Sequence, residues 1–107
     1  MATIGTAPSA ESLTATGTTQ ATAYTVLAEV NRFSTVASGT GAILDSTKGR
    51  GEVQAVFNDG ANALRVYPPV SGEINNLGTN TAILLAPQSA VEFTKITDLI
   101  WTGVLSA

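Results

Sequence analysis

Hydrophobic and polar residues alternate most regularly between positions 52 and 58 of this chain. The apolar residues Val53, Ala55 and Phe57 lie on one face there, and the polar residues Glu52, Gln54 and Asn58 lie on the other. Successive side chains of a β-strand point to opposite faces, and this pattern therefore predicts a half-buried strand. The apolar set is the face that we expect to be buried.

A turn and a second strand are predicted directly afterwards. The residues Asn58-Asp59-Gly60 tolerate positive φ, so we expect the chain to reverse there, as a β-hairpin, into a strand over Ala63 to Tyr67. The pair Pro68-Pro69 should end that strand, because neither proline can donate a ladder hydrogen bond.

Further short strands are predicted on both sides of this hairpin. Residues 24 to 37 combine near-helical spacing with β-forming residues, and we favour two short strands with a kink near Glu29 to Asn31 over a helix. The other strands are expected over Glu73 to Leu77, Ala82 to Ala86, Ala90 to Ile96 and the last segment, 98 to 107. This last segment is apolar on both faces, which predicts a strand covered on both sides.

The strand pattern predicts an all-β fold. About eight short strands at a spacing of roughly 8 to 12 residues are typical of an antiparallel β-sandwich or barrel, of which the jelly roll is one member. A length of 107 residues fits a single domain. We therefore expect one antiparallel, jelly-roll-like β-sandwich domain over residues 23–107.

The first 22 residues form a compositional segment of their own. They are rich in Ala, Thr, Ser and Gly, with Glu11 as the only charge, and most of their apolar side chains are too small to drive a core. This composition favours an extended N-terminal arm over residues 1–22, ordered by a partner or by another subunit, with a frayed tail as the alternative. The segment shows no signal-peptide pattern and the chain has no apolar run of membrane-spanning length, so we expect synthesis in a cytoplasm and no membrane partner.

Composition and charge argue against several classes of partner. Only 12% of the residues are charged, against a usual figure of about 25%, which suits a surface that is buried against copies of the chain or against a neighbour. The net charge of -3 gives no electrostatic reason to expect nucleic acid. The chain has no cysteine and no histidine, so it lacks disulfides, Cys-based zinc sites and the commonest neutral-pH acid or base.

The remaining candidate chemistry is weak. The eight carboxylates show no spacing that implies one catalytic site, and we expect no enzyme activity, although a small hydrolase on a β-sandwich is an alternative. The residues Asp45-Ser46-Thr47 and Asn58-Asp59 offer oxygen ligands but lack the acidic pattern of a calcium loop, so we expect no metal and no cofactor.

Three side-chain groups are candidates for binding. Tyr67 with its neighbour Arg65 would form a glycan-binding platform if the aromatic face were exposed, and otherwise Tyr67 is a rim aromatic packed on prolines. Trp101 lies among aliphatic residues and belongs either to the core or to a subunit interface. Lys48 and Arg50 would meet an acidic surface of a partner or else lie in a solvated loop.

Four segments follow one another between residues 17 and 93, namely GTTQATAYTVLAEVNRFSTVASGTGAIL, GANALRVYP, INNL and NTAILLAP. In these segments and their order the chain resembles small virion structural proteins of tailed bacteriophages, of the capsid decoration and fibre-like kind. This resemblance implies a non-enzymatic β-sandwich that works as an oligomer, a homotrimer, and binds the major capsid protein on the outside of the virion as a cement protein.

Two functional expectations follow from this resemblance. As a decoration protein, the chain would make its subunit or capsid contacts through the arm, the basic pair and the single tryptophan, namely Thr3, Ile4, Leu13, Thr18, Thr19, Lys48, Arg50 and Trp101. As a head-fibre or tail-fibre module, the alternative, it would bind host glycans through Arg65 and Tyr67.

Overall fold

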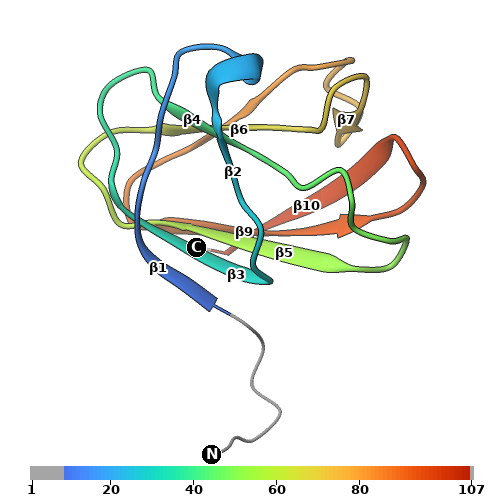
Figure 1. Cartoon of the computed structure of the whole chain (residues 1–107), viewed down its shortest axis with the longest axis horizontal. Helices are drawn as coiled ribbons and strands as arrows, with labels where there is room; N and C mark the ends of the chain where they lie inside the picture. Colours follow the sequence, from blue (N-terminus) through green and yellow to red (C-terminus); the bar gives the residue numbers. More distant parts are fainter. Residues whose placement is uncertain (1–8, 107) are drawn as a thin grey trace, which may run out of the picture.

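The protein is a two-layer all-β structure. The computed structural model describes residues 9–106, and within this range ten strands form two sheets that lie one above the other (Figure 1). The larger sheet has the strand order β1-β3-β5-β9-β10-β7, and the smaller has the order β2-β4-β6-β8. The strands are β1 (Ser9–Thr14), β2 (Tyr24–Thr25), β3 (Val30–Thr35), β4 (Gly41–Ile43), β5 (Val53–Asn58), β6 (Leu64–Tyr67), β7 (Glu73–Ile74), β8 (Ile83–Leu85), β9 (Ser89–Lys95) and β10 (Ile100–Ser106), and a short 3-10 helix, η1 (Gln20–Thr22), precedes β2.

The first half of the chain winds around the core in a coil. Each strand from β1 to β6 lies in the sheet opposite to that of the strand before it. As a result, β1, β3 and β5 are parallel neighbours in the larger sheet, and β2, β4 and β6 are parallel neighbours in the smaller one. This winding is like that of a β-solenoid. The later strands close it, because β8 and β9 pair antiparallel with β6 and β5, and β10 pairs antiparallel with β9.

The prediction of an all-β fold with two sheets is confirmed, but the prediction of antiparallel pairing is wrong. Among the described residues, five of the eight strand pairs are parallel. The pairing and winding are therefore not those of a jelly roll. The physical reason is that most turns carry the chain across the core to the opposite sheet instead of folding it back beside itself.

The turn after β5 shows how this crossing is made. The buried amide of Asn58 donates from Nδ2 to the carbonyl oxygens of Asn62 and Leu85, at 2.9 and 2.8 Å, and its Oδ1 accepts from the Gly60 nitrogen at 2.9 Å. These bonds hold the turn between the two layers, so that β6 pairs with β4 rather than with β5. The predicted β5–β6 hairpin is therefore wrong. The predicted end of β6 at Pro68 is confirmed, since β6 ends at Tyr67.

The buried and exposed faces of β5 are the reverse of the prediction. Gln54, Val56 and Asn58 are fully buried, whereas 40% of Phe57 is exposed. The two amides can lie inside because backbone groups of loops and of β8 complete their hydrogen bonds. Gln54 Nε2, for example, donates to the Val26 oxygen at 2.9 Å. A buried polar group costs little free energy when it is hydrogen-bonded in this way.

The predicted arm is wrong for residues 9–22. Strand β1 pairs in parallel with β3, Leu13 packs against the core, and Ala15 is buried. Thr16 continues the pairing as a bridge to Gly41 in the smaller sheet. Residues 1–8, with the predicted contact residues Thr3 and Ile4, lie outside the described part of the chain.

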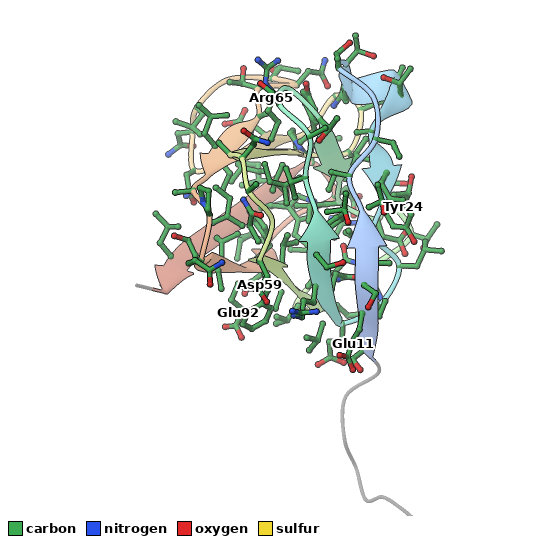
Figure 2. All side chains as sticks on the ribbon, turned by 90° about the vertical axis from the view of Figure 1, so that its left-hand side faces the viewer. Glu11, Tyr24, Asp59, Arg65 and Glu92 are labelled. Atoms are coloured by element: carbon green, nitrogen blue, oxygen red, sulfur yellow. The ribbon has the colours of Figure 1, made fainter. Side chains whose placement is uncertain are left out.

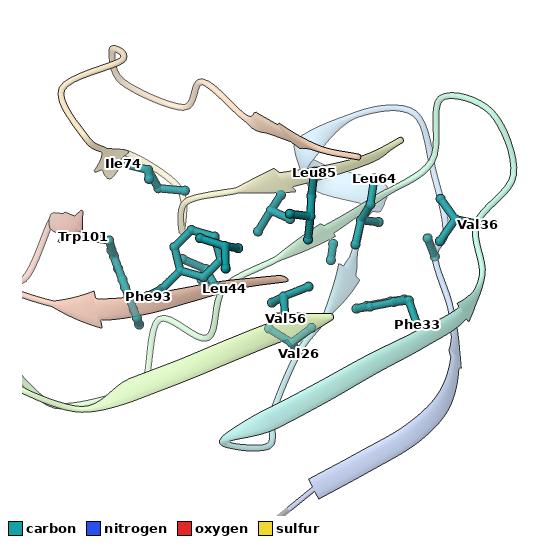
Figure 3. Close-up of a cluster of buried hydrophobic side chains, with 14 residues drawn as sticks. Val26, Phe33, Val36, Leu44, Val56, Leu64, Ile74, Leu85, Phe93 and Trp101 are labelled. Carbon is teal, nitrogen blue, oxygen red and sulfur yellow. The ribbon is translucent and has the colours of Figure 1, made fainter. Parts of the chain in front are cut away.

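The core lies between the two sheets (Figure 3). Trp101, Phe93 and Ile74 fill one end of it, and Phe33 and Val36 fill the other. The ring of Tyr24 meets that of Phe33 edge to face at 5.7 Å, a favoured geometry for aromatic pairs. The prediction of two short strands within residues 24 to 37 is confirmed, because β2 and β3 are separate strands in different sheets, and the break between them spans residues 26–29.

Candidate functional site

The candidate functional sites of this protein are the outer surfaces of its two sheets. Within residues 9–106, no group of three or more Asp, Glu, His or Cys side chains is placed to hold a metal ion. In the same range, no helix is long and apolar enough to cross a membrane. What the fold does present is two broad sheet surfaces that carry large apolar side chains.

The outer surface of the larger sheet follows from the strand register. Residues paired across neighbouring strands point to the same side, so the rows Val30–Ala55–Glu92–Val104 and Val53–Thr94–Thr102 both face away from the core. The row Arg32–Phe57–Ala90 and the residue Ile100, next to Trp101, share this side. We call this surface the six-strand face and define it as Val30, Arg32, Val53, Ala55, Phe57, Ala90, Glu92, Thr94, Ile100, Thr102 and Val104.

The six-strand face is mostly apolar and open to solvent. Phe57, Ile100 and Val104 are 40%, 38% and 66% exposed, and the aliphatic residues between them are partly exposed. This differs from the prediction that the last strand is covered on both sides, since β10 buries Trp101 inside and presents Val104 outside. An exposed apolar surface of several strands is typical of an interaction site.

Two charged side chains, Arg32 and Glu92, lie among the central strands of the six-strand face, and Glu73, the register partner of Ile100, lies beside it on β7. Arg32 donates from Nε to Asp59 Oδ2 at 2.5 Å, and both side chains are partly exposed. Glu92 is exposed between Ala55 and Val104, and no ion pair joins it to another described residue. Figure 2 shows Glu92 and Asp59 toward the lower side of the molecule, with Arg65 toward the upper side.

The outer surface of the smaller sheet is more uneven. We call it the four-strand face and define it as Thr25, Gly41, Ile43, Arg65, Tyr67, Ala82 and Leu84. Gly41, Arg65 and Leu84 lie in one row of it. A hollow of about 320 Å³ is lined by Arg65, Tyr67, Ala82 and Leu84, and a second one of about 280 Å³ lies beside Ile43 and Val70. Each hollow leaves room that an inserted group would fill.

Tyr67 does not present the exposed aromatic face that the glycan prediction requires. Tyr67 is only 9% exposed. A Cβ atom added at Gly41 would lie 2.9 Å from Cε2 of the tyrosine ring, so the ring packs closely over this glycine. Arg65 beside it is exposed. The aromatic is thus packed on the sheet, and the guanidinium is the freer of the two predicted contacts.

The predicted basic pair lies at one end of the two layers, in the loop between β4 and β5. Arg50 Nε approaches Asp98 Oδ1 at 3.3 Å, and both side chains are exposed. This hydrogen bond and the charge of Arg50 hold the pKa of the Asp98 carboxyl below its ordinary value of 3.8.

A buried lysine holds the loop between β4 and β5 in place. Lys95 Nζ donates to the carbonyl oxygens of Ser46 and Lys48, at 3.3 and 2.5 Å. The carboxylate of Asp45 accepts from the nitrogen and the hydroxyl of Thr47, at 2.9 and 2.7 Å. Two of the oxygen atoms that the sequence suggested as ion ligands, Asp45 Oδ1 and the Thr47 hydroxyl, are therefore hydrogen-bonded to each other.

The predicted contact residues are not brought together by the fold. Leu13 packs at the margin of the core, Thr18 and Thr19 are exposed beside η1, and Trp101 is fully buried and offers no surface to a subunit partner. The six-strand face was missed. Its signal was present in the apolar residues on both faces of the last strand, but we interpreted these as two covered faces.

Comparisons with known proteins give no match to a family model, to a curated protein or to a solved structure.

Proposed function

We propose that this protein is a non-enzymatic structural protein of a bacteriophage virion, a decoration protein that binds the outer capsid surface as an oligomer and stabilises the shell. The observation that carries this proposal is the exposure of large apolar side chains on both outer sheet faces, with Val104 on one and Leu84 on the other. The resemblance of the sequence to phage decoration proteins supports it, and implies three-fold assembly.

The two faces suit contacts between large rigid surfaces. Their side chains stand on hydrogen-bonded strands, so little conformational entropy is lost when they are buried against a partner. Each subunit that bridges two coat subunits adds buried apolar surface to the closed shell but not to the burst one. The closed shell is thereby stabilised, because a ligand that binds one state shifts the equilibrium toward it.

The hollow beside Leu84 is the part of the four-strand face that best fits a capsid contact. The hollow, of about 320 Å³, can hold an apolar side chain, and Arg65 at its margin can form an ion pair with an acidic group. We expect Leu84→Asp to abolish binding to particles that lack this protein, with Ser38→Asp, an exposed loop position, as the matched control.

Binding is measured by co-sedimentation of purified full chain with such particles, together with an image of the native particle in which the protein is located. If the chain does not bind particles, or if Leu84→Asp binds as tightly as the unchanged protein, the proposed capsid contact is wrong.

Glycan binding by a fibre module is the second candidate, and the same hollow supports it because Arg65 and Tyr67 both line it. A glycan array with the full chain and with Arg65→Ala tests this function. Specific glycan binding that is lost in Arg65→Ala, together with no binding to particles, would replace the decoration function by this one.

A further inference from the structure

We infer that the six-strand face of one chain is covered by the six-strand face of a second copy, with Glu92 of each copy against the partner's Arg32. The inference rests on the proposed function in taking this protein to act as an oligomer. The capsid takes no part in it. Three observations support it: the size of the face, the placing of its charges and the state of the sheet edges.

The size of the face limits it to one contact. The residues that define it come from β3, β5, β9 and β10, and these four strands, at about 4.8 Å spacing and six or seven residues long, cover roughly 19 by 20 Å in projection, which the accessible surface of the side chains exceeds. A stable interface buries about 800 Å² on each partner. The six-strand face therefore has room for one copy of the chain and not for two side by side.

The charges of the face select a partner of the same kind. A purely apolar partner would bury the Glu92 carboxylate without a counter-charge, which is strongly unfavourable. Arg32 lies two strands and two residues away on the same face, at about 12 Å from the strand and residue spacings. A two-fold axis in the plane of contact, midway between Glu92 and Arg32, sets each carboxylate against the guanidinium of the other copy, twice.

Arg32 has donors to spare for this contact. Only its Nε is engaged by Asp59, and a guanidinium carries five N–H donors. Among the described residues, none accepts from the four donors on its terminal nitrogens, and these can bind a carboxylate in the bidentate geometry that favours Arg–carboxylate pairs. The intramolecular ion pair with Asp59 also orients the guanidinium before the second copy arrives.

Both edges of the larger sheet are unsuited to strand pairing with another chain. At one edge, β1 is irregular, with two register shifts and a positive φ of 59° at Ser12. At the other, the Asn75 amide binds both backbone groups of Gly103, accepting from its nitrogen at 2.9 Å and donating to its oxygen at 3.0 Å. Such devices prevent edge-to-edge association, which leaves the face as the surface for self-contact.

A contact between two six-strand faces also gives a closed dimer. The six-strand and four-strand faces are on opposite sides of the two layers. A contact of one face with the other would repeat from copy to copy as an open filament, whereas two six-strand faces satisfy each other in a closed pair. The four-strand face then remains available to the capsid.

Light scattering of the full chain, over a range of concentrations and without capsids, tests the pairing. The expected mass is twice the 10.9 kDa of one chain, or six times it where three such pairs assemble around a three-fold axis. Glu92→Arg alone and Arg32→Glu alone each set like charges against each other at both contacts, and each should weaken pairing by about 30-fold or more. An equimolar mixture of these two variants opposes unlike charges at both contacts and should recover the pair.

Leu84→Asp, on the opposite face, is the matched control and should keep the mass of the unchanged protein. Circular dichroism reports that each variant is folded. Three results would each overturn the inference. The unchanged chain could be a folded monomer or a trimer, the single variants could pair as tightly as the unchanged chain, or the mixture could fail to recover the pair. Because capsid binding is measured separately through Leu84, a monomer that still binds particles would refute the pairing and the oligomeric state, but it would leave the proposed capsid contact standing.

Discussion

Replacing Gln54 by methionine should destabilise the protein strongly although it leaves the volume of the core nearly unchanged. Gln54 is fully buried in β5, where its Oε1 accepts from the Asp45 nitrogen at 2.9 Å and its Nε2 donates to the oxygens of Val26 and Ala28 at 2.9 and 3.1 Å. One amide thus ties the loop after β2 and the loop after β4 to the larger sheet. Methionine has a similar shape and makes none of these bonds.

The magnitude follows from the groups that lose their partners. The Ala28 oxygen keeps a second donor in Asn31, whereas the Val26 oxygen and the Asp45 nitrogen have no other partner among the described residues. An orphaned buried backbone group costs about 1–3 kcal/mol, so two of them lower the free energy of unfolding by roughly 3 kcal/mol after the easier desolvation of methionine is allowed for. For a domain of this size that corresponds to a fall in Tm of roughly 12–20 °C.

Urea unfolding at a fixed protein concentration measures this difference. The fluorescence of Trp101, the only tryptophan and fully buried, reports the loss of the core. Ser34→Met, at an exposed position of β3, is the control for the effect of a new methionine and should change the free energy of unfolding by less than about 0.5 kcal/mol. If Gln54→Met is as stable as Ser34→Met, the buried amide does not hold the loops and the reasoning fails.

Three further changes test other parts of the fold. Lys95→Met removes two hydrogen bonds from the buried ammonium to loop carbonyls, and should lower the free energy of unfolding by about 2 kcal/mol. It should also speed amide hydrogen exchange in residues 45–51, and unchanged exchange there would contradict this role of Lys95. Gln88→Gly should raise stability by about 0.5 kcal/mol, because the residue has a positive φ of 65°, while Gln88→Ala should give no gain in the same thermal melt. The pKa of Asp98 is lowered by Arg50 in the folded protein, so the stabilisation is present above the unfolded pKa and is lost as pH falls below it and through the lower folded pKa. Asp98→Asn should therefore lose less stability than the unchanged protein on acidification below about pH 4, by a small amount that shrinks with added salt, and equal losses would speak against the pairing.

The sequence determined the local structure of this protein because local structure depends on neighbouring residues. Alternation of side chains gave the strands, and the double proline after Tyr67 gave the end of β6. The break between β2 and β3 was visible in the same way. The low charge content also pointed to a surface that is used for contacts, although it could not say which surface.

Only the tertiary structure decided which strands are neighbours and which faces are buried. Turn residues near Asn58 are compatible with a hairpin and with a crossing between sheets, and the choice depends on a bond from Asn58 to the distant Leu85. Gln54 is polar by sequence, yet it lies inside because loops 26 and 28 residues away in the chain supply its acceptors. For the same reason Phe57 faces outward and contributes to the six-strand face. Burial of a polar side chain depends on partners that are distant in sequence, and a local pattern of hydrophobic and polar residues carries no record of them.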